Sequence, residues 1–469
     1  MLAHRRKHWF LWFFVLIGGV VGCLGGSPSF AANISEFVNI RPYAELEGGF
    51  DDNLFGLSED AELPEDAEDR EDSYIAAGAG VIADITFERR LLNLGIGLDY
   101  NYTYKTYSNN SYLDAGENDL TFELSLSSQY ESKGLFNDRV KFSINDVLDY
   151  IPVNEEKPLL EGNRTWKNSL MTGVDYNLIS KPRTAFILGY TYSRIDYGDD
   201  PITIQIGGGY DSSDELMQES QTHRGRASFK HALNSKLFYV LDYVYDFTMR
   251  EEKARALTSA DFTRQNVTTG VQAKLTPKIH ASINAGYSMT SYDDVDGLSQ
   301  DDQDSVVGEA SLTGNFNHRP LMTLGYKRYY TENDFGDTLL SDDVFARLGF
   351  KIAQGFIVTV TGDYILEDRD LFDDDTKQTL FGVDTEYELV KNLKVMLGYT
   401  YRDKDFFEYN FLAVKDREET THEFSGGLEY KLSRYFLLKG MYYYTDKSSN
   451  VDTEEYSRNK FVASGRVIF

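Results

Sequence analysis

Cysteine, proline and long apolar segments are scarce in this sequence. The chain has one cysteine, Cys23, and 9 prolines in 469 residues, and no Pro/Ser-rich tract divides it. Because Cys23 lies in the amino-terminal segment described below, the rest of the chain has no thiol for a disulfide or a thiolate metal site. Beyond that segment no apolar run is long enough for a membrane-spanning helix, which excludes a helical membrane protein.

Positive charge is scarce as well. Lys and Arg number 47 against 75 Asp and Glu, which gives a formal net charge of −28. Such an acidic chain is a poor partner for nucleic acid. The histidines are scattered, and no H-E-x-x-H, G-x-S-x-G or Cys/His cluster is present. We therefore expect no enzymatic activity, no cofactor and no metal ion.

One acidic loop partly resembles a calcium-binding loop. The segment 293–297, Asp-Asp-Val-Asp-Gly, resembles the start of an EF-hand loop. The spacing fails because Tyr292 stands where the first ligand should be and no Glu closes the loop. Solvated loops, bridged to lipopolysaccharide by divalent cations, are the better interpretation.

The amino terminus predicts export. Residues 4–8 are basic, an apolar run extends from Trp9 to about Leu24, and Ser29 and Ala31 are the small residues that a signal peptidase recognises. We expect a signal peptide at 1–31 and a mature chain of 32–469. A second possibility is lipidation, because residues 20–23, Val-Val-Gly-Cys, resemble a lipobox ending in Cys23.

The carboxyl terminus predicts a β-strand with one apolar face. Phe461, Ala463, Gly465, Val467 and Phe469 alternate with polar and charged residues up to the last position. A final strand of this kind resembles the assembly signal of bacterial outer-membrane barrels, which the barrel-assembly machinery recognises. Phe461, Val467 and Phe469 are the residues that would form it.

The same period of two recurs along the chain. One example is the segment 92–104, in which apolar and tyrosine side chains alternate with small or polar ones. The apolar side carries Tyr toward one end, as expected for strands that cross a membrane. Similar alternation occurs at 120–127, 186–193, 239–247 and 393–402, and the segment 220–232 is the least regular.

Short and long connections alternate between these segments. The short ones are often basic or contain Pro, such as 181–183, Lys-Pro-Arg. The long ones are mostly acidic, such as 51–72, where Arg70 is the only cation. All short turns therefore fall at one end of the strands, and we predict an all-β fold: a single transmembrane antiparallel up-and-down β-barrel of about 20 strands, with 18 as the fallback.

This arrangement also predicts location and orientation. Short periplasmic turns and long outer loops are typical of integral proteins of the Gram-negative outer membrane. An even number of strands would place both termini in the periplasm. The partners expected from this are outer-membrane lipid and lipopolysaccharide.

A barrel of this width must hold water or a plug. The connection from Ile195 to Glu219, with the apolar segment 202–206 inside it, is the expected constriction. The alternation predicts a lumen of mixed charge that leans toward cation selectivity, although any wet wall needs charged residues for solvation. The candidate lumen-facing residues are Asp99, Glu123, Asp175, Asp242, Asp246, Asp363, Lys394, Arg402, Glu423, Lys439 and Arg466.

One short motif resembles a known family. Phe50, Asp51, Asp52, Asn53, Leu54 and Phe55 follow the first expected strand. They are similar to the Y-D-D-N-hydrophobic-F signature of the putative β-barrel porin type 2 family, with Phe50 in place of Tyr. The aspartates and Asn53 could accept backbone hydrogen bonds and shape the first loop.

The resemblance implies a function in exopolysaccharide or capsule secretion, together with periplasmic polysaccharide-export proteins. Tyr329, Tyr435 and Tyr443 are candidates for stacking on sugar rings in the lumen. Two other functions stay open: a general diffusion or small-solute porin, and a surface scaffold or adhesin that works through its acidic loops.

Overall fold

The computed structural model describes the chain with gaps. The described residues are 38–55, 57, 69–89, 92–111, 115–129, 138–152, 164–197, 203–206, 209–212, 219–250, 261–293, 302–315, 321–332, 338–369, 374–407, 417–451 and 455–469. The expected signal peptide at 1–31, including Cys23, lies outside them. No helix in this part of the chain is long and apolar enough to cross a membrane.

The described residues form β-strands joined by turns and loops, and the strands are long. They run from the carboxyl side of the expected signal peptide to the penultimate residue of the chain. In chain order they are β1 (Val38–Asp51), β2 (Asp72–Arg89), β3 (Leu92–Tyr107), β4 (Ala115–Gln129), β5 (Asp138–Pro152), β6 (Arg164–Ser180), β7 (Thr184–Tyr197), β8 (Thr203–Ile206), β9 (Gly209–Ser212), β10 (Ser220–Ala232), β11 (Leu237–Arg250), β12 (Phe262–Thr276), β13 (Ile279–Tyr292), β14 (Gln303–Asn315), β15 (Leu321–Glu332), β16 (Thr338–Ala353), β17 (Phe356–Arg369), β18 (Asp374–Val390), β19 (Leu393–Phe407), β20 (Arg417–Lys431), β21 (Phe436–Ser449) and β22 (Tyr456–Ile468).

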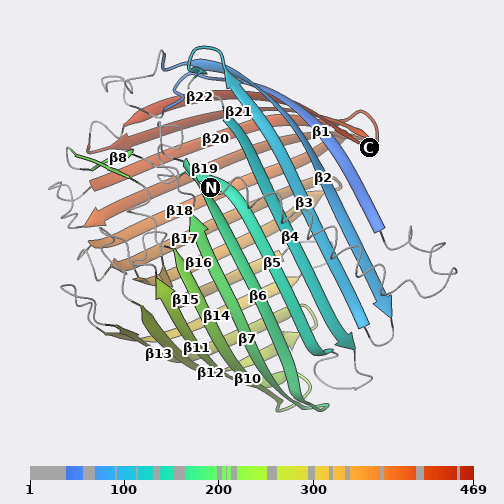
Figure 1. The fold of residues 1–469 in the computed structure, drawn as a ribbon, viewed down its shortest axis with the longest axis vertical. Helices are drawn as coiled ribbons and strands as arrows, with labels where there is room; N and C mark the ends of the chain where they lie inside the picture. The colour runs from blue at the N-terminus through green and yellow to red at the C-terminus, as the bar shows by residue number, and fades with distance from the viewer. Residues whose placement is uncertain are drawn as a thin grey trace, which may run out of the picture.

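Twenty of these strands form one closed antiparallel sheet. Each strand pairs with the next along the chain, except that β7 pairs with β10. The sheet closes where β1 pairs with β22, from Tyr43 opposite Ile468 to Asp51 opposite Lys460. Figure 1 shows β1 in blue beside β22 in red at this seam. The prediction of an up-and-down barrel of about 20 strands is confirmed, and the irregular segment 220–232 forms the complete strand β10.

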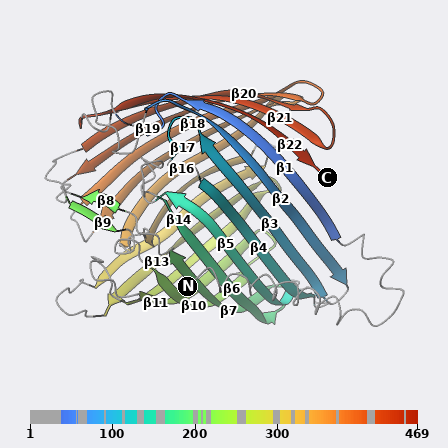
Figure 2. The same ribbon diagram turned by 45° about the horizontal axis from the view of Figure 1, so that its top comes forward.

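The short connections lie at one end of the barrel. Two of the two-residue turns, 354–355 and 391–392, contain a residue with positive φ: Gly355 at 76° and Asn392 at 73°. Gly and Asn tolerate this conformation best, so the sequence matches the turn geometry. The two-stranded β8–β9 sheet belongs to the connection between β7 and β10. Figure 2 shows it at the left of the view.

Each strand has an apolar and a polar face. Large apolar side chains such as Leu46, Ile75 and Ile283 are about 60% exposed on the outside of the sheet. Residues directly opposite one another in a ladder share a face, so the polar positions of neighbouring strands meet. In a bilayer the apolar face must contact lipid. The polar face therefore lines the interior of the barrel.

Candidate functional site: the barrel interior and its seam

Five of the candidate lumen residues belong to ion pairs that cross from strand to strand on the polar face. On β10 and β11, Arg224 Nε lies 2.6 Å from Asp246 Oδ1, and Arg226 Nη2 lies 3.8 Å from Asp242 Oδ1. On β16 and β17, Arg347 Nη2 lies 2.7 Å from Asp363 Oδ1.

The remaining ion pairs are formed by Lys394 and Arg466. Lys394 Nζ lies 3.8 Å from Glu386 Oε2 and 3.9 Å from Glu429 Oε1. Arg466 Nη2 lies 2.5 Å from Glu45 Oε2, across the seam of the barrel. These pairs leave a wall of mixed charge whose two signs are locally balanced.

The other candidates lie on the same polar face. Asp175 on β6 is half-buried, and its carboxylate occupies the space beside Gly189 of β7. The remaining side chains are exposed and belong to β3, β4, β19, β20 and β21: Asp99, Glu123, Arg402, Glu423 and Lys439. Their part in conduction stays a prediction. Tyr329 and Tyr443 share this face, opposite Ser341 and Lys460 respectively, whereas Tyr435 lies in the turn before β21.

The sequence did not point to the partners of these residues. Arg224, Arg226, Arg347, Glu45 and Glu386 were not among the candidates. Each of them is separated by an even number of positions from other polar residues of its strand. That spacing could have placed them on the polar face. Register between strands decides which of them meet, and one sequence carries little information about register.

The motif at 50–55 lies at the seam. Asp51 is 1% exposed and its carboxylate accepts from Arg458 Nε at 2.9 Å. Asp52 accepts from the backbone nitrogen of Asn459 at 2.5 Å and from its Nδ2 at 2.6 Å. The two aspartates therefore attach the end of β1 to the start of β22.

The rest of the motif closes the corner above the seam. Asn53 Nδ2 donates to the carbonyls of Ser457 at 3.0 Å and of Leu57 at 2.8 Å, and its Oδ1 accepts from the nitrogen of Leu57 at 3.1 Å. Phe55 is 1% exposed, whereas Phe50 is 37% exposed on the outer face. The motif thus fastens the first strand to the last.

The carboxyl-terminal residues lie on the outer face of β22. Phe461 is 56% exposed and Phe469 is 70% exposed, and Val467 shares their face. The backbone nitrogen of Phe469 donates to the carbonyl of Pro42 at 2.8 Å. The last residue is thus fixed by its backbone while its ring faces outward.

Polar groups also occur on the outer face, both at mid-strand and near the ends with long connections. Tyr190 bonds His223 at 2.7 Å and Tyr399 bonds His422 at 3.0 Å. Lys377 Nζ lies 3.3 Å from Asp405 Oδ2. Aromatic girdles followed by polar groups are typical where a barrel leaves the hydrocarbon core.

Two loop predictions fall mostly outside the described residues. Within Ile195–Glu219 the structure describes 195–197, β8, β9 and 219, and Ile202 is not included. Of the segment 293–297 only Asp293 is described. Within the described ranges, no group of three or more His, Cys, Asp or Glu side chains is arranged to hold a metal ion.

These features define the class of protein: an outer-membrane β-barrel. The model of the family described as "Putative beta-barrel porin 2" matches residues 376–469, from β18 to the end of the chain. This match confirms the resemblance first suggested by the motif at 50–55, and it does so from the opposite end of the sequence. No curated protein matches.

Solved structures resemble the chain in fold. The FrpB iron transporter from Neisseria meningitidis in its apoprotein form is 8% identical with a TM-score of 0.50, over 94% of this chain and 83% of that one. OccAB4 from Acinetobacter baumannii is 11% identical with a TM-score of 0.41, over 92% and 99%. At these identities the likeness concerns the barrel fold alone.

Proposed function

We propose that this protein is an outer-membrane channel that takes part in the export of an exopolysaccharide or capsule. The observation that carries the proposal is the closed 20-stranded wall with a polar inner face. Barrels of 16 to 18 strands already leave an aqueous channel. Every described strand other than β8 and β9 belongs to this wall.

The interior offers surfaces suited to sugars. The ring of Phe345 lies over Gly325 of the neighbouring strand on the polar face and is partly exposed. Tyr443 is 36% exposed on the same face. Aromatic faces and nearby hydroxyls are the groups on which pyranose rings pack. A polymer that slides along such a wall makes many weak contacts and no single tight one.

The proposal includes an orientation and partners. The short turns and both termini of the chain face the periplasm, where the turns form a low rim for polysaccharide-export proteins. The long acidic connections face outward among lipopolysaccharide. The apolar outer face and the carboxyl-terminal strand engage lipid and the barrel-assembly machinery. We propose no catalytic role.

A diffusion porin is the second candidate. The observation that favours it is the set of ion pairs between neighbouring strands of the inner wall, such as Arg224 with Asp246 and Arg347 with Asp363. Such pairs give the inner wall a mixed, polar surface that suits small polar solutes. This function predicts uptake defects for solutes and no effect on polymer.

The deciding experiment is quantification of polysaccharide in a strain that lacks the gene, beside the same strain complemented. Export predicts loss of extracellular polymer, accumulation of polymer in the periplasm and recovery on complementation. Sensitivity to large antibiotics serves as a control for general damage to the outer membrane. Unchanged polymer with reduced solute uptake would replace the export function with the porin.

A further inference from the structure

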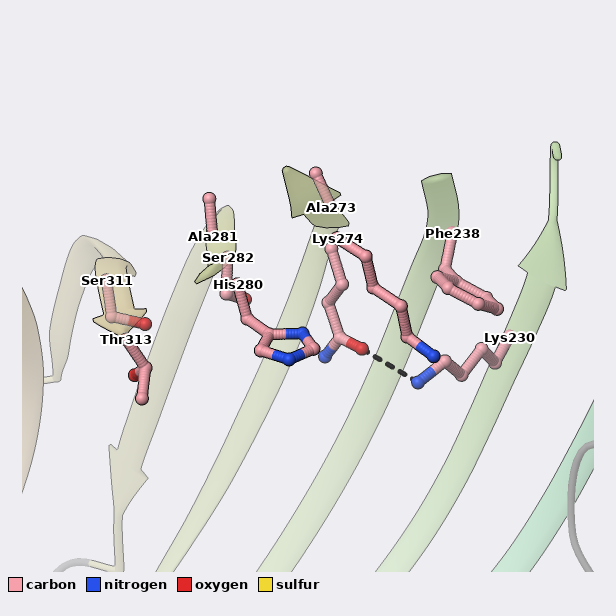
Figure 3. Close-up of a pocket in the computed structure, with 10 residues that line it drawn as sticks. Lys230, Phe238, Ala273, Lys274, His280, Ala281, Ser282, Ser311 and Thr313 are labelled. Atoms are coloured by element: carbon pink, nitrogen blue, oxygen red, sulfur yellow. Dashed lines mark hydrogen bonds between the residues drawn. The ribbon is translucent and has the colours of Figure 1, made fainter. Parts of the chain in front are cut away.

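A pocket opens into the interior from the wall formed by β10 to β14. Its volume is about 330 Å³, and the residues that line it are Lys230, Phe238, Gln272, Ala273, Lys274, His280, Ala281, Ser282, Ser311 and Thr313. Figure 3 shows Lys230, Lys274 and His280 directed toward a common space beside the ring of Phe238. The volume lies at the lower end of the range of small-ligand sites.

Register brings these side chains together. Phe238 of β11 is opposite Gln272 of β12, Gln272 is opposite Ser282 of β13, and Ser282 is opposite Ser311 of β14. This row is part of the polar face. It lies within a few residues of the short turns 233–236 and 277–278, so the pocket is at the short-turn mouth of the barrel.

The polar groups of the pocket are cationic or neutral. Lys230 Nζ donates to Gln272 Oε1 at 2.7 Å. The ammonium groups of Lys230 and Lys274 lie 5.1 Å and 5.6 Å from the centroid of the Phe238 ring. No carboxylate lines the pocket. In the described part of the chain neither lysine forms an ion pair.

The cationic pocket differs from the wall around it. On the neighbouring strands β10 and β11, Asp242 and Asp246 already pair with Arg226 and Arg224. In a chain with a formal charge of −28, these two ammonium groups have no carboxylate within ion-pair distance among the described residues, which leaves them available to an external anion. Charge-assisted hydrogen bonds to that anion would be stronger than neutral ones.

The neutral groups specify more than a charge. The ring of Phe238 gives a flat apolar surface beside the two ammonium groups. The amide of Gln272 and the hydroxyls of Ser282, Ser311 and Thr313 supply donors and acceptors around it. A pyranose ring packs its C–H face on an aromatic ring and directs its hydroxyls sideways, and a carboxylate on that sugar would reach the lysines.

We propose that this pocket binds a carboxylated sugar unit, a uronate or a similar acidic pyranose, as the polymer enters the short-turn mouth. The inference rests on the proposed export function and names the class of substrate. Lys274 is exposed, so water screens its charge and binding is weak. Weak binding suits a polymer that has to move on. The bound unit orients the chain for its passage along the interior wall.

Another pocket of the interior is less suited to an anion. It has a volume of about 360 Å³ and is lined by Glu47, Tyr443, Thr445, Arg458, Lys460 and Val462. Its Arg458 is held by Asp51, and Glu47 places a carboxylate in the wall. The charge of this pocket is largely compensated within the protein.

The test uses the full mature barrel in planar bilayers, with tetragalacturonate as the probe on either side. We expect transient block of the current, and the double variant Lys230→Gln/Lys274→Gln should weaken block about tenfold, as two charge-assisted contacts are lost. The matched control is Lys431→Gln, an exposed lysine at the short-turn end of β20, which should leave block within about twofold. Equal weakening in both variants would overturn the site in favour of a general lumen field.

Neutral and inorganic probes separate sugar recognition from charge. Maltotetraose should block more weakly than tetragalacturonate, and Phe238→Leu should weaken block by both oligosaccharides. Inorganic phosphate that blocks as strongly as tetragalacturonate and is insensitive to Phe238→Leu would overturn the sugar assignment. These results are independent of the gene-deletion experiment. Specific block with unchanged polymer in cells would overturn the export function, whereas lost polymer without specific block would overturn the pocket.

Discussion

The guanidinium of Arg458 on β22 holds the buried carboxylate of Asp51 on β1. These residues are 407 positions apart, and they meet because the first and last strands pair antiparallel. The seam is thus joined by side chains as well as by the backbone ladder. Asp51 is 1% exposed in its side chain and Arg458 is 20% exposed, so water compensates little if one partner is lost.

The first prediction concerns this pair. Arg458→Met leaves the carboxylate of Asp51 buried without its partner, and we expect a loss of about 3 kcal/mol in the free energy of unfolding. The measurement is urea unfolding of the refolded barrel in lipid vesicles. The control is Arg41→Gln, which breaks a pair with Asp84 whose side chains are 46% and 49% exposed. It should cost less than about 1 kcal/mol, and equal losses would contradict the importance of burial at the seam.

The second prediction concerns close packing inside the barrel. A methyl group on Gly49 would overlap the ring of Tyr74, which is 3% exposed and donates to Glu47 at 2.8 Å. We expect Gly49→Ala to cost about 1 to 3 kcal/mol through overpacking. The measurement is the same unfolding assay. At Gly440 nothing lies within 4 Å of an added Cβ, so Gly440→Ala should not destabilise.

A double-mutant cycle tests the cause of that loss. In a Tyr74→Ala background the space beside Gly49 is empty, so Gly49→Ala should lose most of its cost. A cost that stays the same in both backgrounds would mean that the ring of Tyr74 is not the obstacle.

Most of the fold could be predicted from the period of two in the sequence, because which side chains share a face of a strand is a local property of that strand. The alternating segment 92–104 lies within β3 (Leu92–Tyr107), and the alternation from Phe461 onward lies in the last strand, Tyr456–Ile468, and the residue that follows it. The strand with the least regular alternation is β10. Its outer face carries His223 and Gly225 where other strands have larger apolar residues.

The site was less accessible to sequence analysis. The pair of Asp51 with Arg458 depends on closure of the sheet. The pocket beside Phe238 depends on the register of several strands, which the alternation of one strand does not encode. Polar residues on the outer face, such as Arg194 with Asp196 at 2.7 Å, further break the simple rule that polar side chains face inward. The rule holds where lipid contacts the wall and weakens near the strand ends.

The third prediction concerns ion selectivity. Asp246 is 5% exposed beneath Arg224, which is 53% exposed in its side chain. Asp246→Asn removes the buried negative charge and leaves the guanidinium facing the lumen, so the reversal potential in a KCl gradient should shift toward anion selectivity. Arg224→Gln should shift it in the opposite direction.

The control for selectivity is a carboxylate on the outer face. Asp405 pairs with Lys377 there, so Asp405→Asn should leave the reversal potential unchanged while the barrel still conducts. A shift of the same size from Asp405→Asn would show that total charge, and not the field of the interior, sets selectivity.

The last prediction separates assembly from stability at the carboxyl terminus. The ring of Phe469 is 70% exposed, and the residue is held through its backbone nitrogen on Pro42. Phe469→Ala keeps that hydrogen bond, so the stability of the refolded barrel should change by less than about 0.5 kcal/mol. In cells the same variant should reach the outer membrane at a much lower level, because the ring would serve as a contact for the assembly machinery. The comparison is folded barrel in outer-membrane fractions against urea unfolding of refolded protein, with Val462→Ala on the inner face as the control. Normal membrane levels for Phe469→Ala would remove the assembly role, and a large loss of stability in vitro would assign the ring a packing role instead.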